Sequence, residues 1–373
     1  MNGRADARRF IAFRFSVIAN NHLQSTLKHC IHQAKQGNPL SDAGFNTLAL
    51  EIFAHQYECN IPYRNYCMAL GSNPDLVTDW REIPALPTDA FKHESSPLVT
   101  FPFQAVQKTF LTSGTTTETK GMHHFASTEI YEHSIISAWH ELNLPECHQA
   151  IFLTPHPRLA PHSSLSHMMG IIDAHFTDTS SWIACESGEL DTEKLIKAAA
   201  SGRPVALLGT AISFLHLFHS LEKPVHLPEG SWAMETGGYK GTRLQLSKNE
   251  LYHLFGEHLS LQPESIINEY SMTELSSQFY SRGLNHPHQG PSWTRIRVID
   301  PTTNTDAKPG EAGHLIIYDL ANLESVMAVR TQDLALIDQT ALDRGPVAFT
   351  LLGRDPSALP RGCSRSSDEF LSS

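Results

Sequence analysis

Apolar residues recur every three or four positions over residues 5–70, as at Leu50 and Phe53, with few turn residues between them. This spacing puts them on one side of a helix, so the pattern predicts a helical lead-in. Prolines then interrupt residues 83–92, which therefore cannot form a regular helix. We expect a fixed connection there that leads into a strand near Thr109.

Short apolar runs alternate with helical segments through the middle of the chain. The pattern predicts helices over residues 128–142 and 211–221, and buried strands over residues 150–153 and 204–210. Such alternation favours a parallel sheet with helices on both faces, in which functional groups gather at the carboxyl ends of the strands. The strand ends that fit this rule are residues 209–210, 235–238 and 266–274.

From Arg295 onward the pattern changes to two apolar strands, over residues 295–301 and 314–318, joined through Gly/Pro turns. This predicts a β-hairpin within a smaller β-rich subdomain, and the fold class is α/β. We expect four segments: a helical lead-in and connection over residues 1–92, an α/β core over 93–294, the β-rich subdomain over 295–352, and a C-terminal tail over 353–373 that carries Cys363.

Composition narrows the function classes. The chain has 373 residues, 40% of them hydrophobic, and its 28 basic and 39 acidic residues give a net charge of -11. Basic runs with interleaved aromatic residues are absent, so we expect no nucleic-acid partner.

No apolar run approaches the roughly 18 residues of a membrane span. Arg14 interrupts the N-terminal apolar patch and no small-residue cleavage site follows, so we expect a helix of a cytoplasmic protein. Six scattered cysteines indicate reduced thiols.

Residues 110–121, Phe-Leu-Thr-Ser-Gly-Thr-Thr-Thr-Glu-Thr-Lys-Gly, follow an apolar strand end and are rich in hydroxyl groups. Backbone N–H and side-chain O–H groups in such a loop can donate to phosphate oxygens, with the lysine as a movable charge. The pattern indicates a nucleotide-binding loop, although an ordinary polar turn is the alternative. The residues concerned are Thr112, Ser113, Thr115, Thr116 and Lys120, with Gly114 allowing close backbone approach.

Further motifs follow this loop in a set order. They are Gly237-Gly238, Tyr270-Ser271-Met272-Thr273-Glu274, residues 309–315 (Pro-Gly-Glu-Ala-Gly-His-Leu), Arg330-Thr331-Gln332-Asp333 and Gly353-Arg354-Asp355. Together with the loop, these motifs resemble the adenylate-forming superfamily of AMP-dependent synthetases and ligases.

Other segments narrow the likeness. They are residues 60–67 (NIPYRNYC), 83–92 with their Phe-Lys end, 236–240 (TGGYK) and 361–363 (RGC). Through them the chain resembles the acyl-protein synthetases of the LuxE type, the long-chain-fatty-acid–luciferin-component ligases, over nearly its whole length. The resemblance implies the large N-terminal domain of the adenylate-forming fold, with mostly parallel sheets covered by helices, the β-rich subdomain, and without the usual mobile C-terminal domain.

The resemblance implies two reactions in sequence. A fatty or similar carboxylic acid attacks the α-phosphate of ATP to give an acyl-adenylate and pyrophosphate, and the acyl group then passes to Cys363 as a thioester. Residues 93–294 would bind the nucleotide and the acyl group. The implied cofactors are ATP and Mg²⁺, and the implied partner is an acyl-accepting protein such as a reductase subunit.

The Tyr270 to Glu274 segment matches the superfamily motif whose parts meet the nucleotide. The resemblance implies that Thr273 contacts the α-phosphate, that Glu274 ligates magnesium, and that Tyr270 lies along the adenine. An acid beside a triphosphate is otherwise repulsive, so a bridging Mg²⁺ accounts for Glu274.

Other site residues follow from the same resemblance. Gly237 and Gly238 would let adenine lie against the backbone, and Asp333 would accept hydrogen bonds from the ribose hydroxyls. Arg354 could reach the phosphate or pair with Asp355.

Cys363 carries the most specific implication, as the acyl acceptor. Flanking Arg361 and Arg365 would favour the reactive thiolate, whereas Asp368 and Glu369 work against it.

Alternatives stay open. An adenylating enzyme could send the acyl group to coenzyme A or to a carrier-protein thiol. Thr117-Glu118 and Gln332 depart from the family pattern, which would suit a non-catalytic binding subunit. His167 could lie near the substrate carboxylate or be a satisfied core histidine. Residues 214–218 could line an acyl channel or pack in the core.

Overall fold

The computed structural model describes residues 21–112, 119–184, 190–237, 246–337 and 348–355. Residues 21–35 are helical, and the helices after them are α2 (Asp42–Cys59), α3 (Ile61–Ala69), α4 (Glu129–Glu141), α5 (Ser164–Phe176), α6 (Thr192–Ala200), α7 (Ala211–Ser220) and α8 (Lys248–Leu259). Short 3₁₀ turns are η1 (Trp80–Glu82), η2 (Thr88–Lys92), η3 (Phe103–Ala105) and η4 (Pro263–Ser265).

The strands run from β1 to β14. They are β1 (Leu86–Pro87), β2 (Lys108–Leu111), β3 (Met122–Phe125), β4 (Cys147–Phe152), β5 (Thr177–Trp182), β6 (Ala206–Thr210), β7 (Trp232–Thr236), β8 (Ile266–Tyr270), β9 (Phe279–Arg282), β10 (His288–Gln289), β11 (Thr294–Ile299), β12 (Gly313–Asp319), β13 (Ala328–Leu336) and β14 (Ala348–Arg354).

The helical lead-in is confirmed for the described residues. Helix α2 begins at Ser41, whose side chain accepts from the Gly44 N–H, and α3 begins at Asn60, which caps it in the same way. Residues 83–92 form β1 and the 3₁₀ turn η2 rather than an α-helix, as their prolines require.

The predicted parallel sheet is confirmed as well. Strand β4 pairs in parallel with β5 and β6, and β6, β7 and β8 continue the parallel order. Alternate residues of each strand point to opposite faces. Ile151 and Leu207 therefore pack in the cluster with α6, α7 and α8, whereas Phe152 and Leu208 pack in the cluster with α4 and α5. Burial on both faces explains why these strands are continuous apolar runs.

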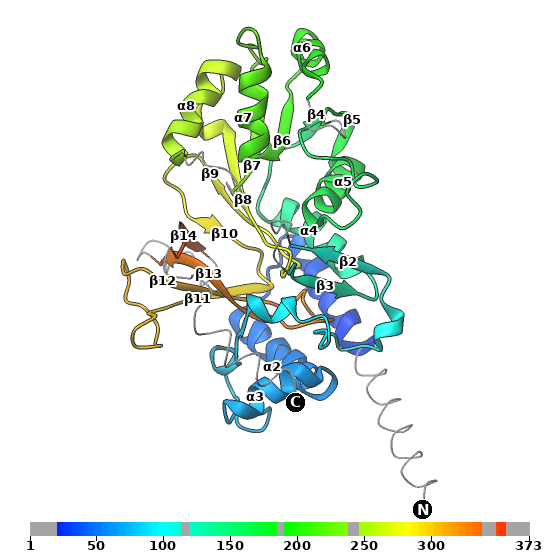
Figure 1. The fold of residues 1–373 in the computed structure, drawn as a ribbon, viewed down its shortest axis with the longest axis vertical. Helices are drawn as coiled ribbons and strands as arrows, with labels where there is room; N and C mark the ends of the chain where they lie inside the picture. Colours follow the sequence, from blue (N-terminus) through cyan, green and yellow to red (C-terminus); the bar gives the residue numbers. More distant parts are fainter. Residues whose placement is uncertain (1–20, 113–118, 185–189, 238–245, 338–347, 356–373) are drawn as a thin grey trace, which may run out of the picture.

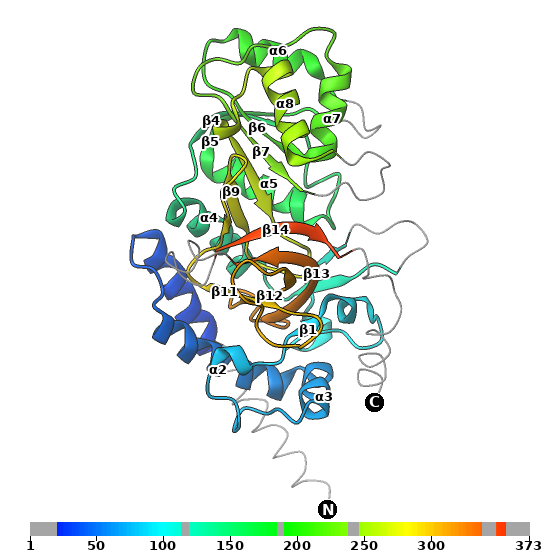
Figure 2. The ribbon, with the colours of Figure 1, turned by 90° about the vertical axis from the view of Figure 1, so that its left-hand side faces the viewer.

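The predicted β-hairpin is β11 with β12, which pair antiparallel. The main sheet runs in the order β11-β12-β13-β14-β10-β9-β8-β7-β6-β4-β5, so β14 joins the β-rich strands to the central ones. The division of the chain at residues 92, 294 and 352 stays a prediction. In Figures 1 and 2, β11 to β14 lie between α2 and α3 at one end and α6 to α8 at the other.

The strand predicted near Thr109 is β2, which forms a separate antiparallel pair with β3. Strand β3 and this pairing were not predicted from the sequence. Within the described ranges, every helix is too short or too polar to span a bilayer.

Candidate functional site

The base of the hydroxyl-rich loop is closed where β2 ends and β3 begins. The Thr112 N–H donates to the Gly121 carbonyl over 2.9 Å, and the Gly121 N–H donates to Thr112 Oγ1 over 2.8 Å. These bonds bring Thr112 and Gly121, the two described ends of the loop, to one place.

Glu274 lies at this loop base. Its Oε1 atom is 3.6 Å from the position that a Cβ at residue 121 would occupy, and its side chain is buried. Its backbone carbonyl accepts a hydrogen bond of 2.7 Å from Asn322 Nδ2. The structure therefore unites Thr112 and Glu274, which are far apart in sequence, around Gly121.

Thr273 is held from two other elements. Its carbonyl oxygen is 2.8 Å from His123 Nδ1, and its Oγ1 is 3.4 Å from Ser164 Oγ. His123 belongs to β3 and Ser164 begins α5.

Tyr270 and Asp333 meet on the other side of the same segment. The Tyr270 hydroxyl donates to Asp333 Oδ2 over 2.8 Å. Burial, followed by the charge of Asp333, raises the pKa of Tyr270 well above its usual 10, and Glu274 adds to the rise. Tyr270 is therefore a fixed donor, and the three acidic and phenolic groups share one neighbourhood.

Gly237 follows β7 directly, beside the end of β8. Strands β7 and β8 pair in parallel with Thr236 opposite Glu269, so the residues after them lie next to each other at the carboxyl edge. Apart from Gly237 itself and its chain neighbours, no heavy atom of the described structure lies within 4 Å of the position that a Cβ at Gly237 would take. The backbone there faces open space, which suits a flat ligand.

Arg354 lies opposite Asp333 in the pairing of β13 with β14. Its guanidinium donates to the Gln332 side chain, and the Gln332 amide in turn donates to Asp89 Oδ2 over 2.9 Å. Asp355 instead pairs with His314, at 2.8 Å. The expected contact of Arg354 with the phosphate stays a prediction.

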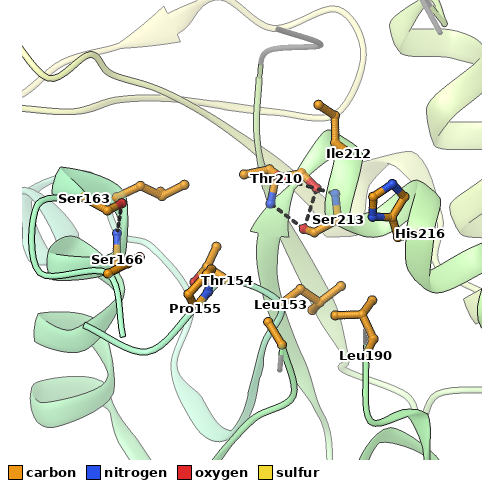
Figure 3. Close-up of a pocket in the computed structure, with 13 residues that line it drawn as sticks. Leu153, Thr154, Pro155, Ser163, Ser166, Leu190, Thr210, Ile212, Ser213 and His216 are labelled. Carbon is orange, nitrogen blue, oxygen red and sulfur yellow. Dashed lines mark hydrogen bonds between the residues drawn. The ribbon is translucent and has the colours of Figure 1, made fainter. Parts of the chain in front are cut away.

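A cavity of about 280 Å³ lies between the ends of β4 and β6 and the first turn of α5. Leu153 and Thr154 follow β4, Thr210 ends β6, and the first turn of α7 contributes Ile212. Ser163, Leu165 and Ser166 complete its wall on the side of α5, and Figure 3 shows these two sides facing each other. Because Ser164 of the same turn lies against Thr273, the cavity adjoins the Tyr270 to Glu274 segment.

A comparison with known protein families identifies the family of this chain. The model of the acyl-protein synthetase family LuxE matches residues 38–372. The chain belongs to this family. It is therefore a ligase that uses ATP, and its family supports acyl-adenylate formation. A comparison with curated proteins found no match.

Similar solved structures agree with the fold of this acyl-protein synthetase. One is an open conformation of 2-hydroxyisobutyryl-CoA ligase in complex with 2-HIB-AMP and CoA, with a TM-score of 0.62 at 13% identity, covering 85% of this chain and 71% of that chain. Another is the same ligase with the same two molecules in the thioesterification state, with a TM-score of 0.60 at 14% identity, covering 85% and 69%. The fold is that of the large N-terminal domain of adenylate-forming enzymes.

Several predicted site residues of the synthetase lie outside the described residues. They are Ser113, Gly114, Thr115, Thr116, Gly238 and Cys363. Lys120 is described and is exposed at the end of the loop, next to Gly121.

The structure shows the surroundings of two groups whose roles the sequence left open. His167 is half-buried, its Nε2 lies 3.1 Å from Glu132 Oε1, and its ring packs on Phe110 and Tyr131. A place for His167 near the substrate carboxylate stays a prediction. The side chains of Phe214 and Phe218 are buried in the hydrophobic core, whereas Ile212, Ser213 and His216 of the same helix line the cavity.

Buried carboxyls lie behind the site. Burial raises the pKa of Glu235, in β7, to about 7, and it also raises the pKa of Glu269, in β8, to about 7. Glu235 Oε1 accepts hydrogen bonds from Asn268 at 2.6 Å and from Tyr252 at 3.4 Å.

Sequence reasoning missed His123, Ser164, Asn322 and the Asp89–Gln332 bond. His123 and Asn322 act through backbone carbonyls, which leave no pattern in a sequence. Among these residues, only Gln332 could have been noticed in the sequence, since it stands where the family pattern has glycine.

Proposed function

We propose that this synthetase activates a fatty or similar carboxylic acid as its adenylate, passes the acyl group to its own Cys363, and hands it on to an acyl-accepting protein such as a reductase. The convergence of Thr112 and Glu274 around Gly121, with Tyr270 and Asp333 alongside, carries the proposal. Among the described residues, Cys30, Cys67 and Cys147 are free thiols, which fits a reducing compartment such as the cytoplasm.

The first step joins two anions. The carboxylate oxygen of the acid attacks the α-phosphorus of ATP, a phosphorus–oxygen bond forms, and pyrophosphate leaves. Donors aimed at the developing phosphoryl charge lower the barrier most when they are already oriented. Thr112 and Thr273 are oriented in this way by their contacts with Gly121 and with Ser164 and His123.

The rest of the loop would complete the phosphate site. Ser113, Thr115, Thr116 and Lys120 would bind the β- and γ-phosphates, with Gly114 giving the backbone room. Thr112 fixes one end of this turn and Gly121 the other.

Glu274 would hold Mg²⁺. A carboxylate and a hydroxyl are the hard oxygen donors that Mg²⁺ prefers, and Glu274 Oε1 lies beside the loop base that Thr112 closes. When bound, the ion neutralises phosphate charge. The residues present therefore fit the metal.

The nucleoside would lie along the carboxyl edge of β7 and β8. Open space beside Gly237 suits the adenine, with Gly238 and Tyr270 next to it. Asp333 keeps its Oδ1 atom for a ribose hydroxyl while Oδ2 accepts from Tyr270. Arg354 stands opposite Asp333 and would reach the nucleotide only by leaving Gln332.

The cavity of about 280 Å³ would take the acyl group. Its lining is mixed, apolar at Leu153 and Ile212 and polar at Ser163 and Thr210. Ser164, between the lining residues Ser163 and Leu165, contacts Thr273, where the carboxylate would meet the α-phosphate.

The second step moves the acyl group. The Cys363 thiolate attacks the carbonyl carbon of the adenylate, the carbon–sulfur bond forms as the carbon–oxygen bond to phosphate breaks, and AMP leaves. Neither Cys363 nor its approach belongs to the described residues, so this step is supported by the family alone.

The test combines two assays on the full chain. We expect acid-dependent ATP–pyrophosphate exchange, together with a hydroxylamine-labile label on the protein from radioactive acid. Cys363→Ser should abolish the label and keep the exchange, whereas Cys185→Ser should change neither. A label that survives Cys363→Ser, or acyl transfer to coenzyme A, would instead support the alternative in which the adenylating enzyme passes the acyl group to a thiol other than Cys363. If no acid supports exchange, the alternative of a non-catalytic binding subunit is favoured.

A further inference from the structure

His123 lies between the two parts of the proposed ATP site. It belongs to β3, two residues after Gly121 at the loop base. Its Nδ1 lies 2.8 Å from the Thr273 carbonyl oxygen, and its Nε2 lies 2.9 Å from Ser325 Oγ. One side chain therefore connects the strand that leaves the phosphate loop to the segment that carries Thr273 and Glu274.

The imidazole has little freedom. It is 1% exposed, and its ring packs on Phe125 at a centroid distance of 4.2 Å and on Phe91 at 5.7 Å. Burial lowers the pKa of His123 to about 4, so the ring is neutral near pH 7 and carries one N–H. A carbonyl can only accept, which puts that hydrogen on Nδ1, and Nε2 then accepts from the Ser325 hydroxyl.

The segment that His123 holds is fixed along its length from elsewhere. Asn322 donates to the Glu274 carbonyl at 2.7 Å. Asp319 accepts from the Ser276 N–H at 2.8 Å and from the Ser277 hydroxyl at 2.7 Å. The bond from His123 to Thr273 reaches this segment from the phosphate-loop side.

We infer that His123 is a positioning residue for adenylation: its Nδ1–H fixes the peptide between Thr273 and Glu274, and thereby aims the Thr273 hydroxyl at the α-phosphate and holds the Glu274 carboxylate at the proposed Mg²⁺ position. This inference rests on the proposed function. A peptide rotated by the loss of this bond would move both side chains together, while the nucleoside contacts of Asp333 and Gly237 would stay in place. The loss should therefore appear in kcat more than in the KM for ATP.

The test uses two amide variants that remove the ring equally. In His123→Asn, the amide nitrogen stands near the position of Nδ1 and can still donate to Thr273. In His123→Gln, the amide stands near the position of Nε2 and can meet only Ser325. Ser325→Ala removes the outer contact alone. Each variant is measured by ATP–pyrophosphate exchange and by thermal unfolding, with active sites titrated.

We expect His123→Gln to lower kcat about 10- to 100-fold, the range for a reacting group displaced by about 1 Å, with the KM for ATP within about threefold. His123→Asn and Ser325→Ala should keep kcat within about threefold of the wild type. Equal losses of kcat in the two amide variants at similar unfolding temperatures would overturn the inference. A loss in KM alone would also overturn it. If the wild type shows no exchange with any acid, the proposed function itself fails, and this inference with it.

Discussion

The Tyr270 hydroxyl donates a 2.8 Å hydrogen bond to Asp333, a residue 63 positions further along the chain. This bond ties the end of a central parallel strand, β8, to β13 of the β-rich part. It joins the residue expected along the adenine to the residue expected at the ribose, so it orients the nucleoside side of the proposed site.

Tyr270→Phe removes this donor and little else. We expect the KM for ATP in pyrophosphate exchange to rise about 5- to 10-fold with kcat within about twofold, because a bond that orients a nucleotide ligand affects ground state and transition state alike. Tyr280→Phe is the matched control: the Tyr280 hydroxyl is buried and has no hydrogen-bond partner in the described structure, so its removal should leave KM unchanged. A fall in kcat without a change in KM would speak against the nucleoside role.

Gly121 has no room for a side chain. A Cβ there would lie 2.9 Å from Thr112 Cγ2, closer than carbon atoms pack. We expect Gly121→Ala to open the loop base next to Glu274 and to lower the exchange rate about 10-fold. Thr112→Ser removes the Cγ2 methyl and keeps the hydroxyl, so the double variant should recover most of the rate. A double variant no better than Gly121→Ala would show that Thr112 and Gly121 are not in contact in solution.

The free energy of unfolding should depend on pH through Glu235. Burial raises the pKa of Glu235 from the ordinary 4.5 to about 7, so the folded protein prefers the neutral acid. The associated stability is present below about pH 4.5 and is lost as the pH rises through about 7, a change of about 3 kcal/mol by linkage. Nearby Lys248 opposes the shift, and Glu269 titrates in the same direction.

Glu235→Gln should therefore be more stable than the wild type at pH 8, while the two should converge at pH 5. An amide keeps the oxygen that accepts from Asn268 and Tyr252. Urea unfolding at both pH values measures the difference. The exposed Glu229→Gln should leave the wild-type pH dependence intact, and a Glu235→Gln protein with that same dependence would refute the assignment.

Ala160 lines the cavity, and its neighbour Leu159 is 50% exposed and does not. Ala160→Trp should fill part of the cavity and shift the acid preference in exchange assays towards shorter chains, with kcat/KM for the best wild-type acid reduced about 10-fold or more. Leu159→Trp adds the same side chain one residue away and should leave the preference unchanged. If both variants have the same acid preference, the acyl group does not bind in this cavity.

Sequence patterns predicted the parallel strands and their helices because burial on both faces leaves continuous apolar runs, as at β4 and β6. They predicted β2 near Thr109 but missed its partner β3, since His123 and His124 are polar in the sequence yet buried in the strand. The pairing of β14 with β10 could not be predicted from the sequence pattern either, because it joins residues that are far apart in the chain.

For the site, the order of motifs predicted that Thr112, Glu274, Tyr270 and Asp333 belong to one region. It did not predict the hydrogen bonds that fix these residues there. The bonds from His123 and Asn322 end on main-chain oxygens, and any residue type supplies such an oxygen. The pairing of Arg354 with Gln332 depends on packing around Asp89 in the same way.

Thr112, Thr273, Gly237 and Asp333 are proposed to share one ATP site along the carboxyl edge of the sheet. A crystal structure of the full chain with a non-hydrolysable acyl-adenylate mimic would show whether they do. We expect ribose hydroxyls hydrogen-bonded to Asp333, adenine beside Gly237, the phosphate mimic between Thr112 and Thr273, and the acyl chain in the cavity by Ala160. A mimic bound elsewhere, with Thr112 and Asp333 contacting no common ligand, would contradict this proposal.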